Sequence, residues 1–394
     1  MNSVIVIGNN YSSVLELIRS LGTAGYEVRL LALSQVVDYI AAKSKYVKKS
    51  VYVPADFFEQ ESEEAELDAL EELRGDEDRI LVIPCRDITC IMLERNWERL
   101  SRHYIIPNIR GTKGELGRFS DKALQEALAV ECGIRTPQGK VFPTTPEGIG
   151  EAVRRVGFPC FMKPLSSMDT RSEKKYLRVC GNEEDLRSWM RRAAEEGGCS
   201  RVLLEKDLSG GREVSAYGAA ADGRVCLPAC ILTIRDGLGT HKGVAAEGMA
   251  VSSSMLGELR GRLEEFVRRS GLNGLFCIDL MEKDGEYYFM EMNLRMGGSC
   301  YAVTEAGANL PAALAGMVYG KETGLPGDIE REVHFVNERI DVDNFRNKLL
   351  TAGQLRKYFA TDAVRFVRSG EDPQPWRQMK KKSLSWTVAR YLSR

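Results

Sequence analysis

The sequence has little of several features that would mark a particular class of protein. Only three of its 394 residues are histidine, and they lie far apart, so a zinc site built on histidine is not expected. Lys and Arg total 55 against 56 for Asp and Glu, which leaves no excess charge to attract nucleic acid or an anionic membrane. No apolar stretch approaches the roughly 20 residues that span a bilayer. We therefore expect neither nucleic-acid binding nor a membrane span.

Two further patterns are missing. The ten cysteines are scattered and never spaced C-x-x-C, and residues 1–8 form a short apolar run rather than a secretion signal. We therefore expect reduced thiols in a cytoplasmic protein. Gly8 stands alone where a dinucleotide-binding fold needs three glycines, so an NAD-dependent enzyme is disfavoured.

What the sequence does contain is an α/β pattern followed by antiparallel strand pairs. Residues 4–33 read as strand, helix and strand, and further apolar strands are expected at 79–85 and 104–108. Beyond about residue 113, helical segments alternate with strand pairs joined by Asp-Gly turns, which indicates antiparallel sheets. We expect an N-terminal α/β domain at 1–112, a two-lobed α+β domain at 113–325 with lobes of about 113–198 and 199–325, and a C-terminal extension at 326–394 whose basic end packs on the body.

The strongest chemical signal lies between residues 278 and 299. Two strands joined by an Asp-Gly turn place Asp279 on the first strand and Glu291 and Asn293 on the second. Because strand side chains alternate, Glu291, Asn293 and Arg295 share one face. Two carboxylates and an amide oxygen suit a hard cation such as Mg²⁺, and the arginine can neutralise a transferring phosphoryl group. An ordinary polar surface hairpin is the competing interpretation.

Two lysines precede this hairpin. Lys163 lies on an apolar strand, where its ammonium needs an anionic partner, and Lys122 opens a helix after Ser120 and Asp121, where the helix dipole favours anions. Either lysine alone is compatible with a surface position. Between them and the hairpin, a strand ends at Glu205, a Gly-Gly turn follows, and Glu213 begins the next strand. Such a turn exposes backbone groups that can bind an adenine edge.

This order of motifs resembles the ATP-grasp superfamily, which includes D-alanine–D-alanine ligase, biotin carboxylase and carbamoyl-phosphate synthase. The resemblance covers about residues 113–311. It implies an α/β N-terminal domain followed by a two-lobed α+β ATP-grasp fold, with ATP between the lobes. The residues after Arg295 look closest to the carboxylate–amine ligase branch, which includes D-aspartate ligases.

The resemblance also implies roles for individual residues. Lys122 and Lys163 would hold the ATP phosphates, and Arg295 and Lys163 would take part in phosphoryl transfer. The remaining implied roles are an adenine pocket at Glu205, Lys206 and Leu208, a ribose contact at Glu213, and Mg²⁺ (or Mn²⁺) ligands at Asp279, Glu291 and Asn293. The family often has a glycine-rich loop after the second lysine, but this sequence has none there, so Ser166, Ser167 and Arg171 are candidates for that task.

The implied reaction is the ATP-dependent joining of a carboxylate to an amine, such as an amino acid or peptide, through an acyl phosphate. The chain would then be a carbon–nitrogen bond-forming ligase, and a homodimer is left open. A bicarbonate-activating enzyme and a non-catalytic nucleotide-binding module are the alternatives. Weaker substrate candidates are Gly297, Gly298 and Ser299, through their backbone amides, and Arg235, His241 and Lys242 in a glycine-rich loop.

Overall fold

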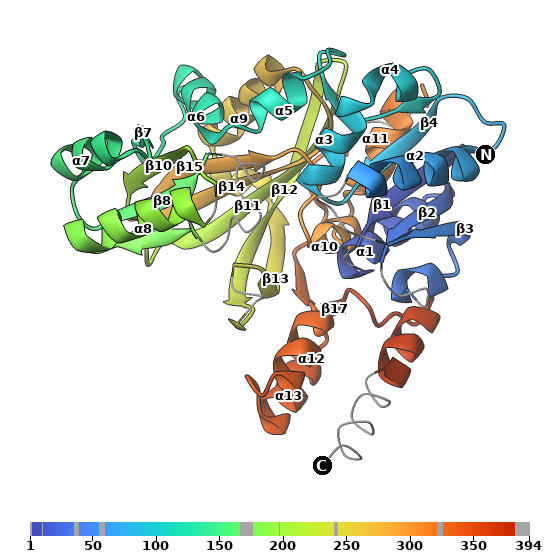
Figure 1. Ribbon diagram of the computed structural model, residues 1–394. Coiled ribbons are helices and arrows are strands. Elements are labelled where there is room, and N and C mark those ends of the chain that lie inside the picture. Colours follow the sequence, from blue (N-terminus) through green and yellow to red (C-terminus); the bar gives the residue numbers. More distant parts are fainter. Residues whose placement is uncertain are drawn as a thin grey trace.

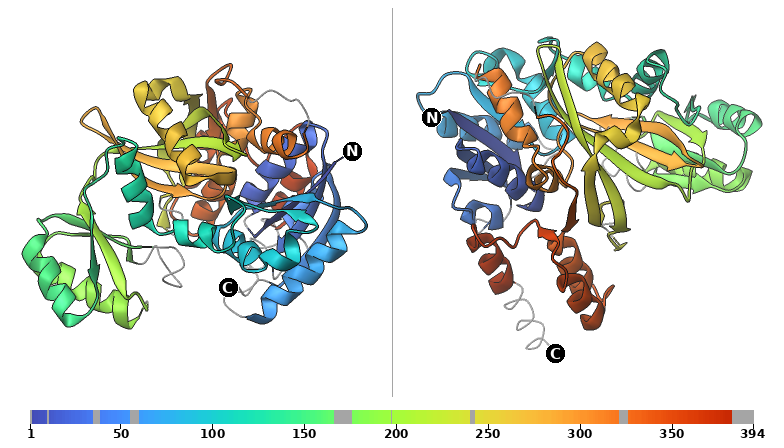
Figure 2. Two further views of the ribbon diagram at one scale, coloured as in Figure 1. Left: turned by 90° about the horizontal axis from the view of Figure 1, so that it is seen from above. Right: turned by 180° about the vertical axis from the view of Figure 1, so that it is seen from behind.

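The chain folds into three successive bodies, an α/β layer, a small sheet and a large sheet (Figure 1). Figure 2 shows the small sheet at one end of the molecule and the α/β layer at the other. No described helix is long and apolar enough to cross a membrane. The structure, a computed structural model, describes residues 2–9, 11–34, 39–54, 60–165, 176–196, 198–239, 243–320 and 326–382.

The N-terminal body is a five-stranded parallel sheet of order β3-β2-β1-β4-β5. Its central strands β1 and β4 are buried along their whole length, as expected for a parallel sheet covered by helices on both faces. The order runs outward from β1 in two directions, so the carboxyl ends of β1 and β4 flank a topological switch point. The elements are β1 (Ser3–Gly8), α1 (Tyr11–Thr23), β2 (Glu27–Leu33), η1 (Ile40–Lys43), β3 (Val47–Val53), α2 (Gln60–Arg74), β4 (Ile80–Pro84), α3 (Asp87–Arg95), α4 (Trp97–Leu100) and β5 (Tyr104–Ile105).

The second body is a small antiparallel sheet of order β7-β10-β8-β9. Helices α7 and α8 cover one face, and their apolar residues share a core with the strands. Each helix has a side-chain N-cap, from Thr145 and Asn182 respectively. The elements are β7 (Lys140–Pro143), α7 (Pro146–Arg155), β8 (Cys160–Pro164), β9 (Arg178–Cys180), α8 (Glu183–Glu195) and β10 (Arg201–Lys206).

The third body is an eight-stranded sheet of order β15-β14-β11-β12-β13-β16-β17, with β6 paired to β14. The two Asp-Gly hairpin turns are confirmed: φ is 50° and 75° at Asp222 and Gly223, and 54° and 78° at Asp284 and Gly285. Two successive positive φ values suit the twist of a two-residue hairpin. The strands are β6 (Asn108–Ile109), β11 (Arg212–Ala221), β12 (Arg224–Asp236), β13 (Ala245–Ser252), β14 (Leu272–Lys283), β15 (Glu286–Asn293), β16 (Val333–Val336) and β17 (Val364–Arg365).

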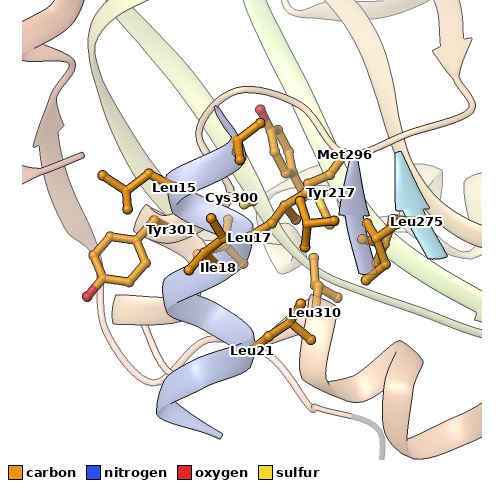
Figure 3. Close-up of a cluster of buried hydrophobic side chains, with 14 of the residues drawn as sticks. Leu15, Leu17, Ile18, Leu21, Tyr217, Leu275, Met296, Cys300, Tyr301 and Leu310 are labelled. Atoms are coloured by element: carbon orange, nitrogen blue, oxygen red, sulfur yellow. The ribbon is translucent and has the colours of Figure 1, made fainter. Parts of the chain in front are cut away.

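Helices cover both faces of the large sheet. On one face lie α5 (Glu115–Phe119), α6 (Lys122–Glu131), η4 (Ser253–Leu256) and α9 (Glu258–Ser270). On the other face, α10 (Cys300–Glu305) and α11 (Leu310–Val318) share one core with α1 of the N-terminal body. Figure 3 shows this core, where Leu17 and Ile18 of α1 lie close to Cys300 and Tyr217. The N-terminal body is thereby fixed against the large sheet.

The C-terminal residues return to the body. Two helices, α12 (Glu338–Arg346) and α13 (Ala352–Phe359), precede this return. The carboxylate of Glu338, the first residue of α12, accepts hydrogen bonds from the backbone N–H groups of residues 366–368. The fully buried Arg19 of α1 pairs with Asp372 at 3.1 Å. The C-terminal segment packs on the body at least as far as Met379, which is buried in the same core. Most of the predicted basic tail, 383–394, lies outside the described residues.

Candidate active site

The β14–β15 hairpin brings the predicted oxygen-bearing side chains together. Asp279 and Glu291 are directly opposite each other in the ladder. Asn293 Nδ2 donates a hydrogen bond to Asp279 Oδ2 at 2.8 Å. On the other side, Ser215 of β11 donates its hydroxyl to Asp279 Oδ1 at 2.7 Å. The sheet register thus builds a cluster around Asp279, and Ser215 is a member that the sequence motif did not reveal.

The two carboxylates have different acidities. Burial, followed by the nearby charge of Glu291, raises the pKa of Asp279 to about 6. Burial also raises the pKa of Glu291, but Lys122 and then Lys163 outweigh it, so the pKa of Glu291 is lowered overall. Glu291 therefore holds its charge more firmly than Asp279, and a cation between them would stabilise both charges.

Lys122 reaches this cluster from the start of α6. The side chain of Asp121 caps the helix by accepting the N–H groups of Ala123 and Leu124, so the prediction that Lys122 opens a helix is confirmed. The lysine is only 7% exposed, and its Nζ lies 3.1 Å from Glu291 Oε2. Capping therefore places an ammonium group at a helix N-terminus beside the hairpin carboxylate.

Lys163 reaches the same region from strand β8 of the small sheet. Its Nζ lies 2.8 Å from Glu205 Oε1 on β10 and donates to the carbonyl oxygen of Met290 on β15 at 3.2 Å. Burial raises the pKa of Glu205, although Lys163 opposes this. The buried lysine thus has the anionic partner that its sequence position requires, and it joins the small sheet to the hairpin.

Arg295 follows β15 and is held by three contacts. Its Nη2 donates to Asn293 Oδ1 and its Nη1 to the Met296 carbonyl oxygen, both at 3.2 Å. Its Nε lies 3.2 Å from Oδ2 of Asp87, the first residue of α3. Asp87 was missed by the sequence analysis. Its position just after β4, at the carboxyl end of a parallel strand, is the signal that could have found it.

The other residues predicted to contact the nucleotide lie on strands β10 and β11 or in the turn between them. Lys206 ends β10 and is exposed, whereas Leu208 is buried. Glu213 lies two positions before Ser215 on β11 and therefore on the same face of the strand. The Glu205 side chain is directed to Lys163.

The residues Gly297, Gly298 and Ser299, predicted to contact the substrate, lie in the turn after Arg295. A Cβ atom on Gly297 would come within 2.2 Å of the Tyr217 hydroxyl oxygen, so only glycine fits there without a shift. A Cβ on Gly298 would lie 3.4 Å from Ser13 Oγ, near the start of α1, and Ser299 is the residue before α10. This turn therefore lies between the hairpin and the N-terminal body.

Arg235 is engaged by protein carboxylates. Its guanidinium donates to both oxygens of Asp341, at 2.8 and 2.9 Å, and to Glu247 at 3.1 Å. It also lies over the ring of Tyr358, 3.8 Å from the centroid. These contacts join β12 to α12 and α13. His241 and Lys242 lie outside the described residues, as do Ser166, Ser167 and Arg171.

Comparison with known proteins identifies the family. Residues 121–320 match the family model described as carbamoyl-phosphate synthase L chain, ATP binding domain. That range contains both lysines, the hairpin and Arg295. The chain belongs to the ATP-grasp family. The predicted ATP-grasp identity is thereby confirmed, ATP is the nucleotide of this domain, and magnesium is typical of its family.

A sequence relative agrees with this assignment. The carbamoyl phosphate synthase large chain of Gemmatimonas aurantiaca is 26% identical over 216 residues, which is 53% of this chain but only 19% of that protein. This chain therefore spans about a fifth of that ATP-grasp relative.

Two solved structures share the fold. The biotin carboxylase domain of Hydrogenobacter thermophilus 2-oxoglutarate carboxylase has a TM-score of 0.67 at 14% identity, over 85% of this chain and 74% of that one. The L-amino acid ligase from Bacillus licheniformis has a TM-score of 0.59 at 17% identity, over 80% and 73%. The two-lobed ATP-grasp fold is thus common to all three.

Proposed function

We propose that this ATP-grasp chain is a carboxylate–amine ligase that forms an amide bond through an acyl phosphate. The observation that supports it is the convergence of Lys122, Lys163 and Arg295 on the β14–β15 hairpin: Lys122 pairs with the Glu291 carboxylate, Lys163 donates to the Met290 carbonyl oxygen, and Arg295 donates to the Asn293 amide oxygen. Phosphoryl transfer depends mainly on positioning and charge neutralisation, and this cluster offers both. A module that only binds nucleotide would not need a guanidinium fixed beside the hairpin.

The hairpin fits a magnesium ion. Asp279, Glu291 and Asn293 would hold it, and the raised pKa of Asp279 reflects a site where a cation would relieve carboxylate repulsion. No group of three His, Cys, Asp or Glu side chains that could hold a metal occurs in the described part of the chain. Two carboxylates are nevertheless enough for Mg²⁺, which keeps waters and binds substrate phosphates. The ion would supply charge neutralisation on ATP, and the Hydrogenobacter domain is a complex with MgADP.

The protein groups then have separable tasks. The ammonium groups of Lys122 and Lys163, which have three donors each, bind phosphate oxygens alongside their carboxylate partners. A substrate carboxylate oxygen attacks the terminal phosphorus, and ADP leaves as the bond to its oxygen breaks. Arg295, fixed by Asn293 and Asp87, stabilises the charge on the transferring group. An amine then attacks the acyl carbon, loses a proton and displaces phosphate.

The carboxylate substrate differs between two proteins that share this fold. The Bacillus protein is an L-amino acid ligase, whereas the Hydrogenobacter domain binds bicarbonate. We propose an organic carboxylate, for which the backbone amides of the Gly297–Ser299 turn, two to four residues after Arg295, are the candidate contacts.

A substrate screen tests this proposal. Purified protein is incubated with ATP, Mg²⁺ and pooled amino acids or peptides, phosphate release is measured, and products are identified by mass spectrometry. We expect phosphate release that needs both an acid and an amine, and a product lighter than their sum by one water. Turnover with bicarbonate and no amino acid would contradict the proposal. The Arg295→Lys variant is the control for contaminating ATPases.

A further inference from the structure

Two cysteines that are far apart in the sequence face each other in the small sheet. Cys160 on β8 and Cys180 on β9 are directly opposite in the antiparallel ladder, and both are free thiols. No other pair of described strands aligns two cysteines. The remaining strand cysteines instead face other residue types, namely Ala219 opposite Cys226, Ala216 and Val251 opposite Cys230, and Tyr217 and Asn293 opposite Cys277.

This register satisfies the geometry of a disulfide bond. Opposed residues in an antiparallel pair have Cα atoms about 4.5 or 5.5 Å apart, depending on the hydrogen-bonding position. A disulfide joins Cα atoms about 4.4 to 6.8 Å apart. Both positions in the ladder fall within that range, so Cys160 and Cys180 can be bridged while the two strands stay paired.

The local fold also allows the thiols to react. Both side chains are buried, but β9 is an edge strand of three residues that pairs only with β8. Opening so short an edge requires far less free energy than unfolding the sheet. The Cys180 thiol donates a hydrogen bond toward the Cys160 sulfur, which lowers the pKa of Cys160 and raises that of Cys180. Cys160 is therefore the first nucleophile, because the thiolate is the reactive form.

We propose that Cys160 and Cys180 form a reversible disulfide with a low-molecular-weight disulfide, such as glutathione disulfide, as the oxidant. The Cys160 thiolate attacks one sulfur of glutathione disulfide and releases one glutathione. The Cys180 thiolate then attacks the Cys160 sulfur of the mixed disulfide and releases the second glutathione. The two protein thiols lose two electrons and two protons, which reduce glutathione disulfide to two glutathione molecules.

The bond would act on ATP binding through Lys163. Cross-strand Cβ atoms lie about 4.5 to 5.5 Å apart, but a disulfide holds them about 3.5 to 4.5 Å apart. Oxidation therefore draws β9 and β8 together by about 1 Å. Lys163 lies three residues beyond Cys160 on β8, and its ammonium is placed by contacts of 2.8 and 3.2 Å. A shift of about 1 Å in the Lys163 ammonium is large compared with the tolerance of a hydrogen bond. The oxidised protein should therefore bind ATP more weakly, by at least about threefold.

The test uses the full chain and does not depend on the ligase reaction. Protein treated with glutathione disulfide is digested without reduction, linked peptides are mapped by mass spectrometry, and ATP affinity is measured by calorimetry before oxidation, after it and after re-reduction. We expect a peptide joining Cys160 to Cys180, an affinity at least about threefold lower, and recovery on reduction. Absence of that linkage overturns the proposed site, and linkage without an affinity change overturns its effect on ATP.

Matched variants separate this pair from the other thiols. Cys160→Ala and Cys180→Ala should each keep their ATP affinity on oxidation. The control is Cys226→Ala, which removes a buried cysteine of the large sheet and should respond to oxidation as the wild type does. A response that persists in both pair variants would contradict the proposal. Peptide mapping of the wild type decides the linkage even if a variant folds poorly.

Discussion

Lys122 and Glu291 form an ion pair across the helix–hairpin contact, with Nζ 3.1 Å from Oε2. The helix is fixed to the strand one turn later, because Gln125 Nε2 donates to the Met292 carbonyl oxygen at 2.9 Å and its Oε1 accepts the Met292 N–H at 2.7 Å. The ammonium group is thus in place before ATP binds. A site organised in advance loses little free energy to rearrangement when charge develops.

The Glu291→Gln variant should retain its fold and lose turnover. The substitution keeps the shape of the side chain but removes the charge that a metal ion and Lys122 require. We expect turnover to fall about 100- to 1,000-fold, the usual loss when one group that stabilises the transition state is removed. The measurement is phosphate release at saturating ATP, with thermal melting to show that the fold persists.

Glu282→Gln is the matched control for this variant. Glu282 lies on the same hairpin and pairs with Arg212, away from the lysines. It should retain turnover close to that of the wild type. If Glu291→Gln were equally active, the hairpin would not be the metal-binding element.

Lys163→Met should weaken ATP binding and also lower the free energy of unfolding. Removal of the ammonium loses a charge-assisted phosphate contact and leaves Glu205 as a buried carboxylate without its partner. Breaking a buried pair in this way typically costs about 3–5 kcal/mol. Denaturant unfolding and calorimetry with ATP measure the two effects separately.

The double variant Lys163→Met with Glu205→Gln distinguishes the two roles. It removes the uncompensated charge, so stability should recover by a large part of the loss. ATP affinity should stay low, because the phosphate contact is still missing. Recovery of both properties together would show that Lys163 acts only through the fold.

Much of the hairpin cluster could be predicted from the sequence, and the reason is local. Two strands joined by a two-residue turn, with alternating side chains, place Asp279 on one strand and Glu291 and Asn293 together on one face of the next. The exact pairing needed the structure, because the turn alone would set Asp279 opposite Met290, and a β-bulge after Asp279 brings Glu291 opposite it instead. The contact between Asp87 and Arg295 could not be predicted, because the two residues are 208 positions apart and meet only through the packing of two bodies. The Lys163–Glu205 pair likewise depends on β10 lying beside β8, which no local pattern specifies.

Glu16 should make the stability of the protein fall as pH rises. It is fully buried on α1, its Oε1 has no partner among the described residues, and burial raises its pKa to about 8 from 4.5. Below about pH 4.5 the carboxyl is neutral in both the folded and unfolded states. Between about 4.5 and 8 the unfolded chain ionises while the folded chain keeps its proton, so stability decreases by up to about 1.4 kcal/mol per pH unit.

Glu16→Gln tests this dependence, since its amide does not titrate. The difference in melting temperature between this variant and the wild type should increase in favour of the variant from about pH 5 to pH 8, then level off. Glu147→Gln, a change at an exposed position on α7, is the control and should give no such trend. A constant difference across the range would mean that Glu16 does not titrate in this window.

Asp87→Asn should lower kcat with little effect on the KM for ATP. Asp87 touches Arg295 rather than the lysines, so its task is to orient the guanidinium and balance its charge. Loss of a charge-assisted contact should loosen Arg295 without removing it, and we expect kcat to fall about 10- to 100-fold. Asp78→Asn is the control, because Asp78 pairs with His103 on the exposed surface of the same body.

The combination with Arg295→Lys decides whether Asp87 acts through the arginine. If it does, adding Asp87→Asn to the Arg295→Lys background should reduce kcat little further, because residues that act as a unit are not additive. Asp87→Glu, which keeps the charge, should recover part of the activity of Asp87→Asn. Multiplicative losses in the double variant would instead indicate two independent roles. A higher KM for ATP with unchanged kcat would assign Asp87 to nucleotide binding rather than to the positioning of Arg295.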